Sequence, residues 1–516
     1  MEKLNPIPPI PPGDLNCLRR KPMPKRLLAA SVLSLVLAVL PVSAAELPLN
    51  LQTCIEMALK ANLGLQVSRL DPAISQMELA QQRAQFGLKA GAQAGLNQNV
   101  SPTNTSFISG ASVLNQTRQN YSLFLEQSLA TGGNLRLELD QNVQETNSTR
   151  ADLNPAYTPQ LALNLSHPLL RNSLNGLRQI SVKENSLKSA AWNYKAQAID
   201  TVAAVQDAYW NLVFYRERMR VQERSLKILE DLLQMNQEKM KAGFMSRIDL
   251  LQTEANIASR RANLLDARRN LENTQDQLKQ LLNPGAKESL VQWDSELLPA
   301  DQPQFKPYAV GLEASYKTAL SSRPDYLIQE LSLNNSQLQE EIAGQNRLPQ
   351  LNLQGSSGLQ SLDGSFSNSL SKMFGLQTYF WSLGLNFEMP VIGNSFETQY
   401  QQAVLVRQQQ ETRLRDLRQQ ILREIRQATR NVEMTAQQVA ATGLAKQLAE
   451  EQLKAQTEKL NLGLTTNFQV LQFQSDFEQA SLAEVNAVIE HIRAINRLQK
   501  AEGTLLEAVG ISWAQS

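Results

Sequence analysis

The sequence predicts a mixed α and β fold, in which long coiled-coil helical hairpins adjoin an antiparallel sheet of the membrane-barrel type. Two long stretches contain almost no Gly or Pro and carry apolar residues at three- and four-residue steps, which is the helical period. Other segments of about ten residues alternate apolar and polar side chains, as strands do. Motifs of the first half recur in the same order in the second half, so we expect two internal structural repeats.

The N-terminus has the organisation of a secretory signal peptide. Basic residues precede an apolar run at 27–40, and small residues follow it up to Ala45. We therefore expect a signal peptide at 1–45, cleaved after Ala45. Met23 is an alternative start, because it opens a conventional signal by itself. The competing interpretation is an uncleaved anchor helix, although the apolar run is short for a membrane span.

Cysteine use predicts a fold without disulfides. The chain has two Cys, and cleavage of the signal peptide removes Cys17. Cys54 is then left without an intrachain partner. Neither residue follows the small residues of a lipid-attachment signal, so we expect no lipid anchor.

Long helices are expected at 177–240 and 396–460, each about 95 Å long at 1.5 Å per residue. Along the helix that follows the first of them, an apolar residue recurs every seven positions: Leu250, Ile257, Leu264, Leu271 and Leu278. This spacing forms one seam that must pack against other helices. Gly243 and Gly463 each precede a short polar segment, and we expect them to close two helical hairpins.

Three pairs of motifs align the two halves of the chain. They are Ala58–Leu59 with Ala319–Leu320, Pro168–Ser173 with Pro390–Ser395, and Gly243–Gln252 with Gly463–Gln472. Each half therefore follows the order helix, strand region, long helix, Gly turn, helix. We expect the first repeat at 46–285, a Pro-containing linker at 286–309 and the second repeat at 310–512.

The strand regions alternate cleanly between apolar and polar residues. The clearest apolar sets are Tyr121, Leu123 and Leu125; Leu135, Leu137 and Leu139; Leu161, Leu163 and Leu165; and Tyr379, Trp381, Leu383, Leu385 and Phe387. Strands of about ten residues with one apolar and one polar face are typical of a transmembrane barrel. A half-buried sheet of a soluble protein shows the same alternation, and the signal peptide and the long helices favour the membrane.

We expect six barrel strands per chain rather than four. The strand region Ala90–Pro168 is about twice as long as its counterpart Leu351–Pro390. The additional residues include a run at 121–129, the turn Thr131–Asn134 and a run at 135–143, which suit an extra hairpin. The alternative is that this hairpin folds over the barrel mouth. Six strands leave two open edges, which lipid cannot satisfy, so the barrel must be shared among copies of the chain in a closed ring.

The inventory of reactive residues is poor. Two His and two Cys leave little basis for a metal site or for His-based catalysis. We interpret His167 and His491 as structural or solvated residues, and we predict no enzyme activity and no cofactor or metal. The Arg-rich run 413–430 is interpreted as a helix surface with pairs such as Glu411 with Arg415. Lys+Arg (50) and Asp+Glu (49) nearly balance, so no basic field attracts nucleic acid.

Taken together, these features resemble the TolC-like outer membrane efflux protein family. The resemblance covers 46–510 and rests on the two Gly-turn segments and two further motifs. These are Ala58–Asn62 and His167–Arg171. It implies a homotrimer with an outer-membrane barrel shared by three chains and a periplasmic α-helical tunnel. It also implies partners: a periplasmic adaptor (membrane fusion) protein, an inner-membrane pump and the lipids of the outer membrane.

The resemblance also assigns residues at the tunnel tip. The residues implied to dock the adaptor are Gly243, Phe244, Met245, Gly463, Leu464 and Thr465. Those implied to narrow the tip are Asp249, Gln469 and Gln472. The family usually has carboxylates at the last two positions and a basic residue at Thr465, so this chain departs from the family's acid–base links. An alternative role for these polar residues is to cap or pack the coiled coil.

Three function classes compete at this point. The first is the exit duct of a tripartite efflux or type I secretion system, which passes small molecules or proteins to the outside. The second is a passive porin-like channel with a periplasmic coiled-coil stalk, and the third is a secreted structural coiled coil. The duplicated hairpin ends favour the duct, because a stalk does not need them.

Overall fold

The fold was examined in a computed structural model, which describes residues 46–243, 246–285, 291–390, 395–462 and 464–513. These residues belong to one compact unit, Ala45–Ser516. The predicted signal peptide and its cleavage site at Ala45 lie outside the described residues.

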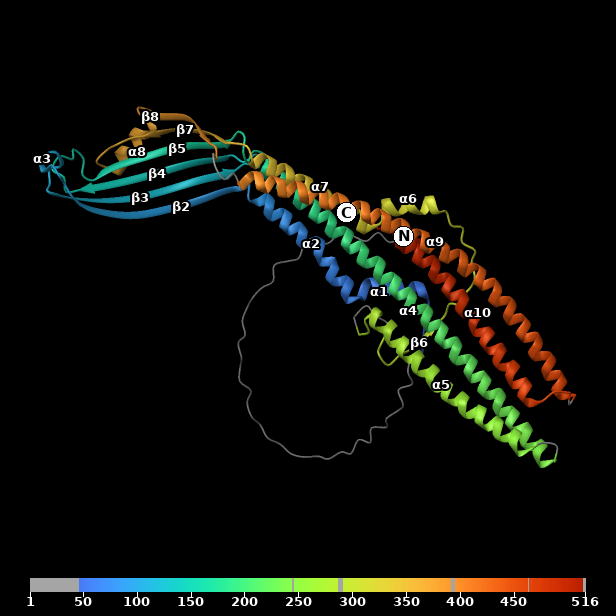
Figure 1. Cartoon of the computed structure of the whole chain (residues 1–516). Coiled ribbons are helices and arrows are strands. Elements are labelled where there is room, and N and C mark those ends of the chain that lie inside the picture. The colour runs from blue at the N-terminus through green and yellow to red at the C-terminus, as the bar shows by residue number, and fades with distance from the viewer. Residues whose placement is uncertain (1–45, 244–245, 286–290, 391–394, 463, 514–516) are drawn as a thin grey trace, which may run out of the picture. The chain divides into compact units, whose positions relative to one another are not determined.

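Four long helices form two antiparallel hairpins (Figure 1). Their bounds are α4 Asn175–Lys241, α5 Arg247–Leu282, α9 Ser395–Asn461 and α10 Asn467–Glu502. The helices α4 and α9 have 67 residues each, which is about 100 Å at 1.5 Å per residue. Both agree with the predicted ranges to within two residues. Helices of this length are stable because one seam packs along the partner helix, as α4 does on α5 and α9 does on α10.

Shorter helices run beside the first part of each long helix. They are α1 Leu51–Ala61, α2 Leu63–Ala84, α6 Leu312–Ser322, α7 Pro324–Asn346 and α11 Leu505–Ala508. The contacts give a lateral order, because α2 packs on α4, α4 on α7 and α7 on α9. In this layer α2 and α9 are the outermost helices.

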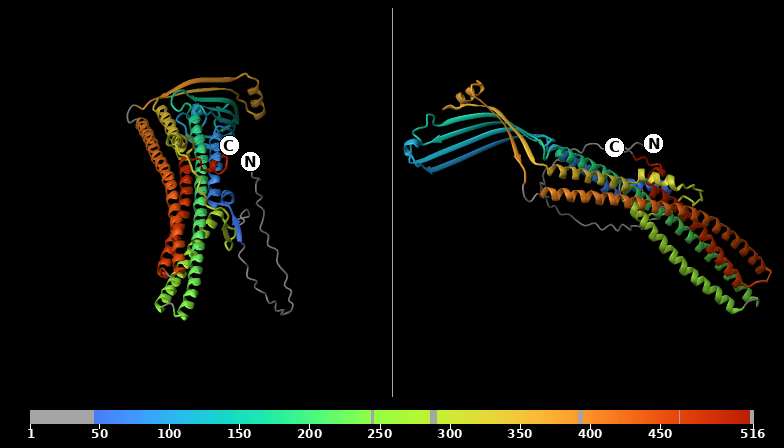
Figure 2. Two further views of the ribbon diagram at one scale, coloured as in Figure 1. Left: turned by 90° about the vertical axis from the view of Figure 1, so that its right-hand side faces the viewer. Right: turned by 45° about the horizontal axis from the view of Figure 1, so that its top comes forward.

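The strands form one antiparallel sheet with the order β2-β3-β4-β5-β7-β8. Their bounds are β2 Leu88–Pro102, β3 Val113–Ser128, β4 Asn134–Thr146, β5 Ala156–Pro168, β7 Gln350–Gln360 and β8 Tyr379–Glu388. The sheet lies at the end of the helices that is remote from the two hairpin turns (Figure 2). All six predicted strands are therefore present in a single sheet.

The start of one strand and two of the connections between strands differ from those predicted. The strand β3 begins at Val113, whereas the predicted alternating run began at 121, because polar residues extend the ladder opposite β2. Two short helices interrupt the connections: α3 (Ser106–Ser109) and α8 (Phe366–Phe374). The β3–β4 turn uses Gly132 at φ +93°, where a Cβ atom would lie 2.7 Å from the carbonyl oxygen of Asn172. Only glycine fits this turn.

The chain also contains a second sheet, which has two parallel strands. The strand β1 (Glu46–Leu49) pairs in parallel with β6 (Glu296–Pro299), which lies inside the predicted 286–309 linker. Next to this pair, the Tyr209 hydroxyl donates to the Asp301 carboxylate at 2.7 Å. Cys54 is fully buried nearby, and burial, aided by the charge of Asp301, raises the pKa of its thiol to about 12. This thiol is inert at neutral pH.

Candidate functional site: helical tips and the two faces of the sheet

The hairpin turns predicted as tips lie at the ends of the long helices. Gly243 follows α4 with φ +80°, and a Cβ atom there would meet nothing within 4 Å, so the residue is needed for its backbone conformation rather than for space. At the second tip, the Leu464 N–H donates to the Lys459 carbonyl at 2.9 Å, the bond that closes a helix end in a Schellman motif. Phe244, Met245 and Gly463 lie outside the described residues.

Large apolar side chains are exposed around both tips. They are Ile248 (71%), Leu251 (53%), Leu462 (73%), Leu464 (72%) and Phe468 (62%). Apolar side chains that gather at one end of a molecule indicate an interaction surface.

The residues predicted to narrow the tip lie at the starts of α5 and α10. Asp249 is in the first turn of α5, and its side chain lies outside what the structure describes. The structure brings Thr465 and Gln469 together, since the Thr465 hydroxyl bonds to the Gln469 carboxamide oxygen. Gln472 donates to the Asp476 carboxylate at 3.1 Å. Both glutamines are exposed. Gln472 bonds within α10, and Gln469 bonds to a residue just before this helix.

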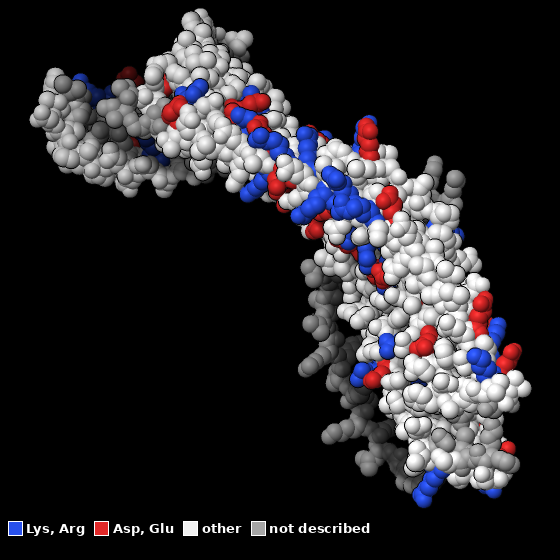
Figure 3. All heavy atoms as spheres, turned by 45° about the vertical axis from the view of Figure 1, so that its right-hand side comes forward, with Lys and Arg blue, Asp and Glu red and all other residues white. Residues whose placement is uncertain are grey.

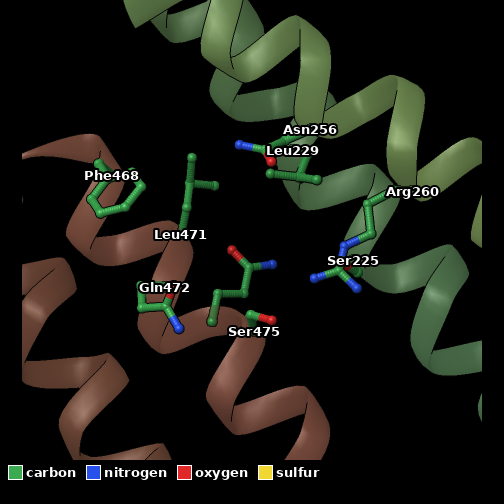
Figure 4. Close-up of a pocket in the computed structure, with 9 residues that line it drawn as sticks. Ser225, Leu229, Asn256, Arg260, Phe468, Leu471, Gln472 and Ser475 are labelled. Atoms are coloured by element: carbon green, nitrogen blue, oxygen red, sulfur yellow. The ribbon is translucent and has the colours of Figure 1, made fainter.

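A small polar cavity of about 170 Å³ lies between the two hairpins near their tips. Its lining residues face each other from α4 and α5 on one side and α10 on the other (Figure 4). They are Ser225, Leu229, Asn256, Arg260, Phe468, Leu471, Gln472, Gln474 and Ser475. Gln472 therefore lies both next to the tip and at the contact between hairpins.

Beside this cavity an ion pair, not predicted from the sequence, joins the hairpins. Arg260 Nη1 of α5 lies 2.8 Å from Glu478 Oε2 of α10, and their side chains are 19% and 9% exposed. Burial raises the pKa of Glu478, while Ser225 and Arg260 act in the opposite direction. A sequence signal did exist: Glu478 follows Val470 and Gln474 at steps of four, so a charged residue occupies a buried seam.

A polar contact also lies inside the first hairpin. Asn236 Nδ2 of α4 donates to Thr253 Oγ1 of α5 at 3.1 Å, and both residues are buried. A buried polar pair in a coiled coil fixes the register of the two helices, because any shift leaves its groups unpaired.

One face of the sheet is apolar and exposed. The register aligns Leu125, Leu137 and Leu163 across three strands, and the next row aligns Leu123, Leu139 and Leu161. On the edge strand β8 the apolar side chains are 62–71% exposed: Tyr379, Trp381, Leu383, Leu385 and Phe387. A continuous apolar face of this extent suits contact with lipid.

The opposite face of the sheet is polar and carries charges. Arg136 lies between Glu126, at 3.6 Å, and Glu138, with which it forms a close ion pair. Its guanidinium also stacks 4.0 Å from the centre of the Phe124 ring. Within the described residues, this face has the character of a water-filled interior.

Both histidines make structural contacts. His491 is fully buried, with Nε2 donating to the Lys306 carbonyl and Nδ1 bonding to Thr435 Oγ1, each at 3.1 Å. His167 Nε2 bonds to Thr131 Oγ1 at 3.2 Å beside the β3–β4 turn. The hydrogen bond from His491 to Lys306 therefore connects α10 to the linker between the two halves.

Acidic and basic side chains mix along the long helices. In Figure 3, basic side chains gather over the middle of the helices with acidic ones beside them, and the strands show few charges. Within the Arg-rich part of α9, Glu411 pairs with Arg407 rather than with Arg415, and Arg415 donates to Thr412 at 3.4 Å. Among the described residues, no three His, Cys, Asp or Glu side chains gather as a metal site.

Within the part of the chain that the structure covers, no helix is both long and apolar enough to cross a bilayer.

The family model described as outer membrane efflux protein matches residues 154–284 and 315–504, more than half of the chain. No curated protein sequence matches.

Three solved structures show the same fold. The CmeC outer membrane channel of Campylobacter jejuni is 18% identical, with a TM-score of 0.63 over 88% of this chain and 86% of that chain. The outer membrane protein VceC of Vibrio cholerae is 16% identical, with a TM-score of 0.62 over 88% and 96%. The open state of the Neisseria gonorrhoeae MtrE channel is 18% identical, with a TM-score of 0.62 over 88% and 89%.

The family match and the arrangement of helices and strands lead to the same conclusion. This chain belongs to the outer membrane efflux protein family, and it serves efflux at the outer membrane with its long helices on the periplasmic side.

Proposed function

We propose that three copies of this chain form one exit duct, which receives its cargo from a periplasmic adaptor and an inner-membrane pump. The observation that carries the proposal is that the outermost strands of the sheet and the outermost helices of the helical layer follow one another along the chain. The sheet ends at β2 and β8, and the helical layer ends at α2 and α9. Because α2 leads into β2 and β8 leads towards α9, one neighbouring copy completes both layers at once.

The free side of α2 supports this closure. Five apolar residues lie on it at steps of four and three: Leu63, Val67, Leu70, Ile74 and Met77. They are 56–66% exposed within one chain. This spacing is that of a coiled-coil seam, which requires a partner helix. On α9, the exposed Leu405 and Val406 offer apolar contacts to such a neighbour.

Closure of three copies gives a barrel to which each chain contributes six strands. The apolar face then contacts lipid, and the polar face with Arg136 and Glu138 lines the interior. The conduit continues between the long helices to the hairpin tips, where the exposed apolar side chains provide the docking surface for the adaptor.

The tip surface tests the part of this proposal that concerns the adaptor. A duct that docks an adaptor at its tip depends on these apolar contacts. In cells, Leu464→Asp should abolish efflux by the assembled system, while the matched substitution Gln76→Asp, which adds the same charge at an exposed position away from the tip, should leave it nearly unchanged.

A measurement of mass accompanies this test. The mass of the detergent-solubilised protein should correspond to three chains, and it should be the same for both variants. A stable monomer would contradict the shared barrel, and full efflux by the assembled Leu464→Asp variant would exclude Leu464 from the docking surface.

A further inference from the structure

The helix α8 has no role in the conduit described so far. It lies between β7 and β8, at the end of the sheet remote from the long helices (Figure 1). It buries Ser369 and Met373 completely against its surroundings, and its contacts are with β5 and β7. Both are interior strands of the sheet, so α8 does not lie on the open edges where neighbouring copies would join.

The strand register shows which face of the sheet α8 covers. Beyond β7 the ladder with β5 continues, because the Ser361 N–H donates to the Pro159 carbonyl and the Asp363 N–H donates to the Tyr157 carbonyl. Ser361 and Asp363 therefore point to the same face as Leu359, since alternate residues of a strand share a face. That face is the apolar one.

Both of these side chains bond to α8. The Ser361 hydroxyl donates to the Ser369 carbonyl, and the Lys372 ammonium pairs with the Asp363 carboxylate. The helix α8 thus packs on the apolar face of the sheet, not on the polar face that lines the interior.

The exposed surface of α8 has two sides. Phe366 and Phe374 are 52% and 59% exposed on the side next to the buried Met373. Asn368, Ser371 and Lys372 are exposed on the other side. Tyr379 and Trp381 of β8 are also exposed, and they point to the same apolar face as Leu359. Exposed Tyr and Trp at the end of an apolar strand face mark the membrane–water boundary of a barrel.

We propose that α8 lies in the outer-leaflet interface of the membrane as an amphipathic anchor. Phe366 and Phe374 enter the boundary between headgroups and acyl chains, and Asn368 and Ser371 face water. The occupant of this surface is lipid, because the apolar side of α8 continues the lipid-facing surface of the strands. The helix fixes the depth at which the barrel sits. The proposal rests on the proposed function in one respect, namely that the sheet spans the membrane.

Fluorophores attached to single cysteines test the proposal in liposomes that contain nitroxide-labelled lipids. Three exposed positions are compared in the full-length protein: Phe374→Cys on the apolar side of α8, Asn368→Cys on its polar side, and Leu383→Cys on the lipid-facing side of β8. Cys54 needs no removal, because it is buried and its thiol is protonated.

A shallow lipid nitroxide should quench the probe at position 374 about twofold more than the probe at position 368. A deep nitroxide should quench the probe at position 383 most strongly. Equal, weak quenching at 374 and 368 with strong quenching at 383 would overturn the anchor and leave the barrel intact. A pyrene excimer at position 374 would show that a second copy covers α8 instead. Absence of quenching at 383 would contradict the membrane-spanning sheet itself.

Discussion

Neutral residues at the tip make this chain differ from the carboxylate-lined constriction implied by the family resemblance. Gln469 and Gln472 bond to Thr465 and Asp476, so their carboxamides stabilise the start of α10. A carboxamide carries no net charge and binds hard cations poorly, whereas a ring of carboxylates in a narrow pore attracts them.

We expect the channel to respond weakly to divalent cations for this reason. In planar bilayers, Gln469→Asp combined with Gln472→Asp should create block by Mg²⁺ or Ca²⁺ added on the periplasmic side. The same substitution at an exposed position away from the tip, Gln76→Asp, should not. Strong block of the unmodified channel at millimolar concentrations would show that other carboxylates, such as Asp476, line the pore.

The buried ion pair Arg260–Glu478 makes the contact between hairpins sensitive to pH. Because burial raises the pKa of Glu478 above its usual value of 4.5, the folded protein holds this proton at a pH where the unfolded chain has lost it. The stability contributed by the protonated form is therefore present at low pH and is lost as pH rises from about 4.5 through the folded-state pKa.

Glu478→Gln should flatten this pH dependence, because glutamine resembles the protonated acid at every pH. The measurement is the midpoint of thermal unfolding, followed by circular dichroism across this pH range in detergent. Glu484→Gln is the matched control, since Glu484 pairs with Lys446 within the second hairpin. The idea fails if the two variants change the pH dependence equally.

At the scale of elements, the β3–β4 hairpin determines how many strands cross the membrane. Its turn packs beside the start of α4, where the Leu174 N–H donates to the Thr131 carbonyl at 3.3 Å. In the proposed barrel we therefore expect this turn at the periplasmic end and the β4–β5 connection outside the cell. This assignment requires both strands of the hairpin to cross.

Thiol labelling of intact cells tests this topology. Gly132 cannot carry a cysteine, since a Cβ atom there would collide with the backbone. We therefore choose Thr131, which is half-buried in the turn itself, and Asp152, which is exposed in the β4–β5 connection.

An impermeant reagent should label Asp152→Cys in intact cells and should label Thr131→Cys only after the outer membrane is opened. Labelling of Thr131→Cys in intact cells would place the hairpin outside and reduce the membrane strands to four per chain. The unmodified protein should stay unlabelled throughout, because Cys54 is buried with a pKa of about 12.

At the scale of the whole molecule, the proposed trimer would depend on surfaces that one chain leaves uncovered. The seam of α2 exposes large apolar side chains, and the edge strands β2 and β8 each lack a neighbouring strand on one side among the described residues. Exposing the apolar seam to water is unfavourable, so its burial against a neighbour would stabilise the assembly rather than the single chain.

A charge placed in the α2 seam should therefore prevent assembly. Ile74→Asp would bury an unpaired carboxylate three times per trimer, at a cost of several kcal/mol each. Gln76→Asp adds the same charge to α2 outside the seam. Native mass measurement in detergent should show monomers for the first variant and trimers for the second, and intact Ile74→Asp trimers would exclude this seam from the interface.

The sequence alone determined the features that depend on local periodicity. The ranges of α4 and α9, the hairpin glycine Gly243 and the six alternating strands follow from residue spacing within short windows, because side-chain direction repeats every 3.6 residues in a helix and every two in a strand. The same information indicated the family before the family model confirmed it.

Only the tertiary structure decided which distant residues meet. The pairing of Arg260 with Glu478, the partner of Glu411 and the face that α8 covers depend on contacts between segments far apart in the chain or on the choice among neighbouring partners. Periodicity specifies the direction of a side chain relative to its own element. The partner across the interface is selected by packing and by the need to pair buried polar groups, and these act only when the elements have come together.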